Sequence, residues 1–257
     1  MIIKKYSQLK EYINAYRDGY ISLLVCRSSG GLAKSHLLRE ALKGEDHQKF
    51  TGHSTPLSIY MTLMKNPDDL VVFDDVDSLI DNKSNVALLK QYCEIEEDKQ
   101  IRYSTTARLK DEEIKPRYTS NNKVCLLCND FKRIGKNIKA LLTRGIYIDF
   151  QPSNEEILSV LKANFKKLDL EIYDYLVKHS LEINDLNFRT YLKCVELKQA
   201  KINWKEYLQK ENGLDYLEEF ALQIADMPKR ERSEMWHNET GKSERTFQRI
   251  LKKSKKR

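Results

Sequence analysis

A loop of small residues near the start of this 257-residue chain separates an apolar run from a segment with helical spacing. The apolar run ends at Cys26, and Lys34 and Ser35 open the helical segment. This order suits a phosphate-binding loop, because backbone N–H groups of the loop and of the helix N-terminus can point at phosphate oxygens. The lysine of such a loop reaches the β- and γ-phosphates, and the serine hydroxyl ligates Mg²⁺. The residues expected to hold a nucleotide are Ser29, Gly30, Gly31, Leu32, Ala33, Lys34, Ser35 and His36.

The loop departs from the usual pattern G-x-x-x-x-G-K-[ST] at both glycines. Ser28 stands at the first glycine position and Ala33 at the last. If the backbone needs a positive φ at Ala33, the alanine is strained by about 1 kcal/mol or more. An ordinary glycine-rich turn between a strand and a helix is the alternative interpretation of this stretch.

An acidic pair follows a second apolar run. Residues Leu70–Phe73 suit a strand buried on both faces of a parallel sheet, and Asp74 and Asp75 come directly after it. Open α/β sheets bind ligands at the carboxyl ends of their strands. We therefore expect Asp74 to support Mg²⁺ through water and Asp75 to orient or deprotonate an attacking water. The alternative is a strand that ends in an Asp-rich turn.

Two more apolar runs carry a polar residue at one end. Val124–Cys128 leads into Asn129, which would lie beside the γ-phosphate if this strand neighbours the first one. Arg144 precedes the last run, at 146–150.

Cys125 and Cys128 have the spacing of a redox or zinc pair. Because they lie inside an apolar run and no second such pair exists, we expect them to be buried structural residues.

Taken in order, these positions resemble the motif positions of the AAA+ ATPases. Lys34-Ser35, Asp74-Asp75, Asn129 and Arg144 look like the Walker A, Walker B, sensor 1 and arginine-finger positions. The Asp-Asp pair looks like the replication-initiator and helicase-loader branch, and like the ATPase subunits of transposons. The segment around Arg189 resembles the part of a helical lid that carries a sensor 2 arginine. The resemblance covers about residues 1–200 and extends to small ATPases of phages and other mobile elements.

The resemblance implies an ATPase that uses ATP and Mg²⁺ and works as a homo-oligomer. Asn129 and Arg189 would sense the γ-phosphate, and Arg144 would reach the nucleotide of a neighbouring subunit. Asp75 stands where a glutamate is more usual, and its shorter side chain has less reach toward a water. Together with Ala33, this substitution favours ATP binding with slow hydrolysis.

Alternating strand and helix signals predict the α/β class for the first 150 residues, with a parallel sheet built from βαβ units. A helix is expected over Lys4–Tyr16, and strands near 21–26, 48–52, 70–74, 123–128 and 146–150. Helical spacing without strand signals follows, and Ser153 or Asn154 can cap its first helix. The predicted architecture is a parallel-sheet P-loop core over 1–151, an all-helical lid over 152–226 and a small helical DNA-binding module over 227–257.

The basic excess of the chain lies entirely at its C-terminal end. Residues 242–257 hold eight basic residues and one acidic residue, so their net charge equals the +7 of the whole chain. A helix over Arg230–Trp236, a break at His237–Gly241 and a helix over Lys242–Leu251 have the layout of a helix-turn-helix, with Met235 and Trp236 packed on the last helix. The residues expected to contact DNA are Lys242, Ser243, Arg245, Thr246, Arg249, Lys252 and Lys253. A solubilising basic tail is the alternative.

Composition narrows the remaining choices. No apolar stretch reaches 18 residues, so no membrane span is predicted, and an odd number of cysteines fits a reducing compartment, which favours the cytoplasm. The polar segment Arg102–Arg117 could contact DNA through Arg102, Arg108 and Lys110, or form a solvated hairpin or helix.

The leading hypothesis is an AAA+ replication initiator or helicase loader, with a replicative helicase as partner. The alternatives are a transposition target-selection ATPase, with a transposase as partner, and a non-hydrolysing DNA-binding adaptor with a degenerate P-loop.

Overall fold

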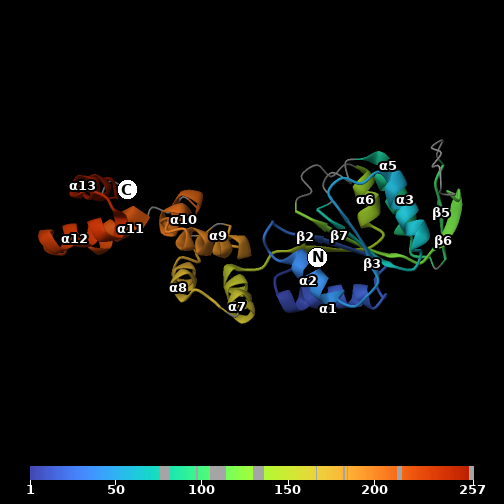
Figure 1. The fold of residues 1–257 in the computed structure, drawn as a ribbon, viewed down its shortest axis with the longest axis horizontal. Helices are drawn as coiled ribbons and strands as arrows, with labels where there is room; N and C mark the ends of the chain where they lie inside the picture. The colour runs from blue at the N-terminus through green and yellow to red at the C-terminus, as the bar shows by residue number, and fades with distance from the viewer. Residues whose placement is uncertain are drawn as a thin grey trace. The chain divides into compact units, whose positions relative to one another are not determined.

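The computed structural model describes residues 1–75, 82–96, 98–104, 114–129, 136–165, 167–181, 183, 185–212 and 216–254. The chain divides into two compact units, Met1–Lys166 and Lys167–Arg257, and both are drawn in Figure 1. The division into three parts at 151 and 226 stays a prediction.

The first unit is built on a six-stranded sheet with the order β1-β8-β2-β7-β4-β3. Its strands are β1 (Ile2–Ile3), β2 (Leu23–Arg27), β3 (His47–Thr51), β4 (Leu70–Asp74), β7 (Lys123–Cys128) and β8 (Ile146–Phe150). Each neighbouring pair is parallel. The five predicted strands are confirmed, with shifts of one or two residues at β2 and β3. Sequence reasoning missed β1, which is too short to show a period of two and pairs only with the edge of β8.

Helices cover both faces of this sheet (Figure 1). They are α1 (Tyr6–Arg17), α2 (Lys34–Ala41), α3 (Pro56–Lys65), α5 (Lys83–Tyr92) and α6 (Lys136–Leu142), and α7 (Asn154–Asn164) follows the last strand. Side-chain caps fix several helix starts: Thr55 accepts from the backbone N–H of Ser58, and of the two candidates Ser153 and Asn154 it is Ser153 that caps α7. The buried Tyr16 hydroxyl of α1 donates to the carbonyl oxygen of Val71 at 2.8 Å, which ties α1 to the sheet.

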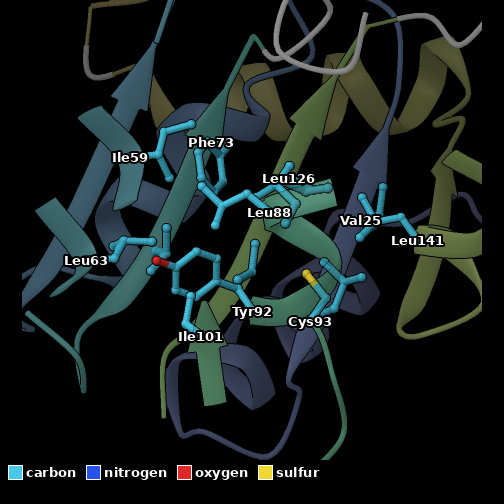
Figure 2. Packing of buried hydrophobic residues seen from close by; sticks show 14 of the residues in the cluster. Val25, Ile59, Leu63, Phe73, Leu88, Tyr92, Cys93, Ile101, Leu126 and Leu141 are labelled. Atoms are coloured by element: carbon cyan, nitrogen blue, oxygen red, sulfur yellow. The ribbon is translucent and has the colours of Figure 1, made fainter. Parts of the chain in front are cut away.

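One hydrophobic core of the first unit lies between the sheet and helices α3, α5 and α6. Figure 2 shows side chains of β4 and β7, such as Phe73 and Leu126, meeting Ile59 of α3 and Leu88 of α5. These residues are at most 2% exposed. All five cysteines of the chain are free and buried, including the pair in β7, so their interpretation as structural residues is confirmed.

A separate two-stranded hairpin extends this core. Strands β5 (Lys99–Arg102) and β6 (Arg117–Ser120) pair antiparallel with Arg102 opposite Arg117. Of the interpretations open for this segment, the hairpin is confirmed at its described ends, whereas Arg108 and Lys110 lie outside the described residues. Lys99 is only 3% exposed, and its ammonium group donates to the carbonyl oxygens of Tyr92 and Asn122. This lysine therefore bonds the hairpin to the C-terminal end of α5.

The second unit is helical throughout its described residues. Its helices are α8 (Leu170–Lys178), α9 (Phe188–Gln199), α10 (Trp204–Asn212), α11 (Tyr216–Gln223), α12 (Lys229–Thr240) and α13 (Glu244–Ser254). Helix α9 packs on α8 and α10, while α11 packs on α13. No helix among the described residues is long and apolar enough to cross a membrane.

The last three helices share one small core of their own. Ala221 and Ile224, at the end of α11, meet Trp236 of α12 and Phe247 of α13. The predicted break at His237–Gly241 is wrong in part: α12 continues to Thr240 and ends at Gly241, whose φ of +66° suits glycine. Trp236 packs as predicted, but Met235 is 43% exposed because it lies on the solvent side of α12.

The burial of Lys99 predicts a pH-dependent stability. Burial, reinforced by the nearby charge of Lys123, lowers the pKa of Lys99 from 10.5 to about 8. Between pH 8 and pH 10.5, Lys99 is therefore mostly protonated in the unfolded chain and mostly neutral in the folded chain. The penalty for burying the charge is complete below pH 8 and is relieved as the pH rises, so the free energy of unfolding should gain about 3 kcal/mol by pH 10.5.

Urea unfolding at several pH values between about 7.5 and 10.5 checks this expectation, with Lys99→Met as the reference because it lacks the titrating group. The difference in unfolding free energy between the two proteins should change with pH in the stated direction. Parallel pH curves for the two proteins would contradict it.

Candidate nucleotide-binding site

Three strand ends converge at the carboxyl edge of the first unit's sheet. Strand β7 lies between β2 and β4, and all three run in the same direction. The loop after β2, the acidic pair after β4 and Asn129 after β7 are therefore neighbours, although about 100 residues of sequence separate the first from the last. This is the edge at which parallel sheets bind ligands.

The loop backbone has the shape that a phosphate site needs. Gly31 has a φ of +80° and Ala33 a φ of +59°, so the alanine occupies the left-handed region that a glycine would enter without strain. Helix α2 begins at Lys34, and Ala33 has no side-chain oxygen with which to cap it. The first N–H groups of α2 are thus left for an anion. Sequence reasoning missed Tyr6, whose hydroxyl donates to the Leu32 carbonyl oxygen at 3.3 Å and holds the loop against α1.

The Lys34 side chain lies within the loop and is buried. Its ammonium donates to the carbonyl oxygen of Ser28 at 2.8 Å, to the Ser28 hydroxyl at 2.6 Å and to the Asn129 side-chain oxygen at 3.3 Å. Ser28, which the sequence marks only as a departure from the pattern, therefore supplies an acceptor that a glycine lacks. The Lys34 ammonium group is therefore fully hydrogen-bonded by the protein's own oxygen atoms.

Ser35 and Asp74, the two residues expected to hold Mg²⁺, lie next to each other. The Ser35 hydroxyl donates to Asp74 Oδ1 at 2.8 Å. Magnesium prefers oxygen ligands, and this hydroxyl and carboxylate lie side by side next to the loop, so the residues present fit the ion. Sequence reasoning missed a third residue next to this pair: Lys49 of β3, which is not a metal ligand, donates to Asp74 Oδ2, also at 2.8 Å.

Asp75 and Asn129 are linked directly. Asp75 has a φ of +62°, which aspartate tolerates better than most residues. The Asn129 side-chain amide donates to Asp75 Oδ1 at 3.2 Å, while its oxygen accepts from Lys34. Asn129 therefore joins the residue expected to bind phosphate to the one expected to position water.

Two predicted site residues, Arg144 and Arg189, do not join this cluster in the first unit, whereas the Ser29 carbonyl oxygen accepts from Lys34 at 3.1 Å. Arg144 precedes β8 and thus lies at the amino edge of the sheet, away from the loop. It pairs with Glu94 at 3.0 Å and donates to the Ala140 carbonyl oxygen at 2.6 Å. Arg189 belongs to the second unit, where it is exposed in the first turn of α9. Their actions on a nucleotide stay predictions. Ser29 and His36 are exposed beside the loop.

The predicted DNA-binding helix exposes a basic face. Arg245, Arg249 and Lys252 are exposed at helical spacing on α13, while Phe247 between them is buried. Ser243 is exposed, Lys242 and Thr246 are half-buried, and the side chain of Lys253 is outside the described set.

The acidic residue of α13 is neutralised within the unit. Glu244 pairs with Arg232 of α12 at 2.8 Å and also accepts from Ser233 and Gln248. Burial opposes ionisation of Glu244, but these hydrogen bonds outweigh it and lower the pKa of the carboxyl group. The carboxylate therefore turns toward α12 and leaves the exposed face of α13 basic.

Comparison with known proteins identifies the fold. No protein-family model and no curated protein sequence matches the chain. Among solved structures, AMPPCP-bound DnaA from Aquifex aeolicus is 14% identical with a TM-score of 0.50, over 88% of this chain and 72% of that one. Domain III of the Thermotoga maritima replication initiation protein DnaA is 17% identical, with a TM-score of 0.49 over 80% and 91%. A point mutant of Thermotoga maritima RuvB is 14% identical, with a TM-score of 0.49 over 86% and 74%.

At these identities the likeness concerns the fold alone. The predicted α/β class is confirmed: the chain has a parallel central sheet covered by helices and followed by further helices, a fold similar to that of the Aquifex aeolicus DnaA.

The backbone at Ala33 gives a test of the loop. Because the alanine is held at a positive φ, Ala33→Gly should raise the free energy of unfolding by about 1 kcal/mol. Ala41→Gly, in the last turn of the same helix, should lower it by about 0.5–1 kcal/mol, since its backbone is helical. Chemical denaturation of both variants checks the pair, and equal losses in the two would show that Ala33 is not strained.

Proposed function

We propose that this chain binds ATP with Mg²⁺ and hydrolyses it slowly, as an AAA+ ATPase that acts on DNA in replication initiation or helicase loading. One observation carries the ATPase part of this proposal: Lys34, the Ser35–Asp74 pair and the Asn129–Asp75 pair converge beside the uncapped N-terminus of α2. These groups are the ones that phosphoryl transfer needs, and they come from three neighbouring strand ends.

Each residue of the cluster has a defined task. Lys34 and the N–H groups of α2 bind the β- and γ-phosphates, and Ser35 and Asp74 hold Mg²⁺, which neutralises phosphate charge when bound. Asp75 orients the attacking water and accepts its proton. Asn129, bonded to both Lys34 and Asp75, transmits the presence of the γ-phosphate to the residue that holds the water.

Arg144 completes the site from a neighbouring subunit in this proposal. It lies at the opposite edge of its own sheet from Lys34, so it serves the nucleotide of another copy better than its own. To do so it must leave its pair with Glu94, which is partly exposed and therefore weak. Arg189 acts as the lid arginine that senses the γ-phosphate.

Two features support slow turnover. Ala33 keeps the loop in a strained backbone, and Asp75 has one methylene less than the glutamate more usual at this position. The same features favour a second candidate, a non-hydrolysing adaptor that keeps the fold and binds DNA. A transposition ATPase shares the site chemistry, and association with a transposase instead of a replicative helicase would identify it.

The exposed basic face of α13 supports DNA binding. Arg245, Arg249 and Lys252 lie on one side of a helix whose opposite side is anchored by Phe247. A helix held in this way can present its cations to phosphates or to a groove without unfolding. The structural neighbour from Aquifex aeolicus is DnaA. The Thermotoga maritima protein of the same name is called a replication initiation protein, and the proposed role in replication is consistent with that name.

The ATPase proposal predicts different effects for two substitutions. Lys34→Ala should abolish ATP binding, because its contacts with the phosphates are lost. Asp75→Asn should keep ATP binding within about threefold and lower turnover at least about tenfold, because asparagine tolerates the positive φ but cannot accept the proton. ATP binding and phosphate release, with and without DNA, measure both.

Lys43→Ala, at an exposed position after α2, is the matched control and should behave like the wild type. ATP binding without measurable hydrolysis in the wild type would favour the adaptor. Absence of ATP binding in the folded wild type would refute the proposal.

DNA binding should depend on the exposed face of α13. The double variant Arg245→Ala/Arg249→Ala should weaken binding to duplex DNA and reduce the slope of log affinity against log salt by about 2. The double variant Lys229→Ala/Arg230→Ala is the charge control, because it also removes two positive charges, and both residues are exposed at the start of α12. Titrations at several salt concentrations measure the slopes, and equal losses in both proteins would show that only net charge matters.

A further inference from the structure

Strand β3 brings a lysine to the metal-binding edge of the site. Lys49 lies outside every sequence pattern that predicted the site, and it follows the P-loop lysine by only 15 positions. Its ammonium group is 2.8 Å from Asp74 Oδ2, a normal distance for a charged hydrogen bond. A lysine ammonium group therefore lies beside the carboxylate that is proposed to support Mg²⁺.

The register of the sheet explains how the two residues meet. Phe50 of β3 lies opposite Phe73 of β4 and stacks on it, facing the core. Lys49 and Asp74 are each adjacent in sequence to one of these rings, so their side chains emerge on the other face of the sheet. Ser35 of α2 contacts Asp74 on that face. Lys49, Asp74 and Ser35 therefore form one continuous row at the edge of the nucleotide site.

Both oxygens of Asp74 are engaged in this row. Oδ1 accepts from the Ser35 hydroxyl and Oδ2 from Lys49. The side chains are only partly exposed, 17% for Asp74 and 37% for Lys49, so the pair is less screened than a fully hydrated one. In this arrangement the negative charge of Asp74 is already balanced before any metal arrives.

We propose that Lys49 is a specificity-determining residue that sets the Mg²⁺ requirement of the site. It balances Asp74 in the nucleotide-free protein, so that Mg²⁺ is retained only together with the phosphates of a bound nucleotide. The physical reason is that the lysine and the metal are like charges that share one carboxylate. This inference rests on the proposed nucleotide binding and adds a residue and a direction of effect to it.

A purely orienting role for Lys49 has the opposite consequence. If the lysine only held Asp74 toward Ser35, its removal would loosen the carboxylate and weaken the metal. If the lysine competes with the metal, its removal strengthens metal binding. The sign of the change in Mg²⁺ dependence therefore separates the two roles.

The test is a Mg²⁺ titration of the binding of a fluorescent, non-hydrolysable ATP analogue to the full chain. Lys49→Met keeps the length and apolar stem of the side chain but removes its charge. We expect it to lower the half-saturating Mg²⁺ concentration about two- to fivefold, the range for a partly exposed ion pair. Lys49→Arg, which keeps the charge, should stay within about twofold of the wild type, and so should Lys43→Met, the charge-matched control.

A second readout needs no nucleotide. MgCl₂ alone should raise the melting temperature of Lys49→Met more than that of the wild type, because Asp74 is then unbalanced in the free protein. An unchanged or higher half-saturating Mg²⁺ concentration in Lys49→Met, with analogue binding intact, would overturn this inference and leave the proposed function standing. Failure of the folded wild type to bind the analogue at any Mg²⁺ concentration would overturn both.

Discussion

The site depends on one constraint, the parallel alignment of β2, β7 and β4. Parallel strands place all their carboxyl ends at one edge, and β7 between the other two spaces the P-loop and the acidic pair on either side of Asn129. Phe73 and Leu126, on the face opposite the nucleotide, hold this alignment by burial against α3 and α5. A change that shifted the register by one residue would turn Asp74 into the core and abolish the site.

The charged side chains of the candidate site are hydrogen-bonded to one another. Lys34 has oxygen acceptors from Ser28 and Asn129, and Asp74 has donors from Ser35 and Lys49. Partly buried charges are stable only when they are paired or hydrogen-bonded, so the free protein uses its own residues for this purpose. In the proposed function, a nucleotide and a metal ion displace some of these contacts. The proposed affinity is then a difference between two hydrogen-bonded states, to which Ser28 and Lys49 contribute.

In the second unit, too, partly buried charges are paired with each other. Arg232 and Glu244 pair inside the last three helices and also contact the core, since the Arg232 guanidinium lies 4.8 Å from the centre of the Phe247 ring. The only acidic residue of the basic C-terminal segment is thereby withdrawn from the exposed face of α13. The Arg232–Glu244 ion pair thus lies against the small helical core, while the basic residues of α13 stay on its outer surface.

Residue types and periods within the sequence determined the P-loop position, the acidic pair, the core strands and the helical character of the C-terminal part, because each rests on local spacing. Three things required the tertiary structure. Lys49 reaches Asp74 only through the β3–β4 register, and Ser28 becomes an acceptor only when Lys34 folds back over the loop. Helix α12 extends through Thr240 because Trp236 packs against Phe247 and its indole N–H reaches the carbonyl oxygen of Ser243. Local patterns predicted most of the strands and helices, whereas contacts between residues distant in sequence decide which charges meet, since only the folded chain brings them within bonding distance.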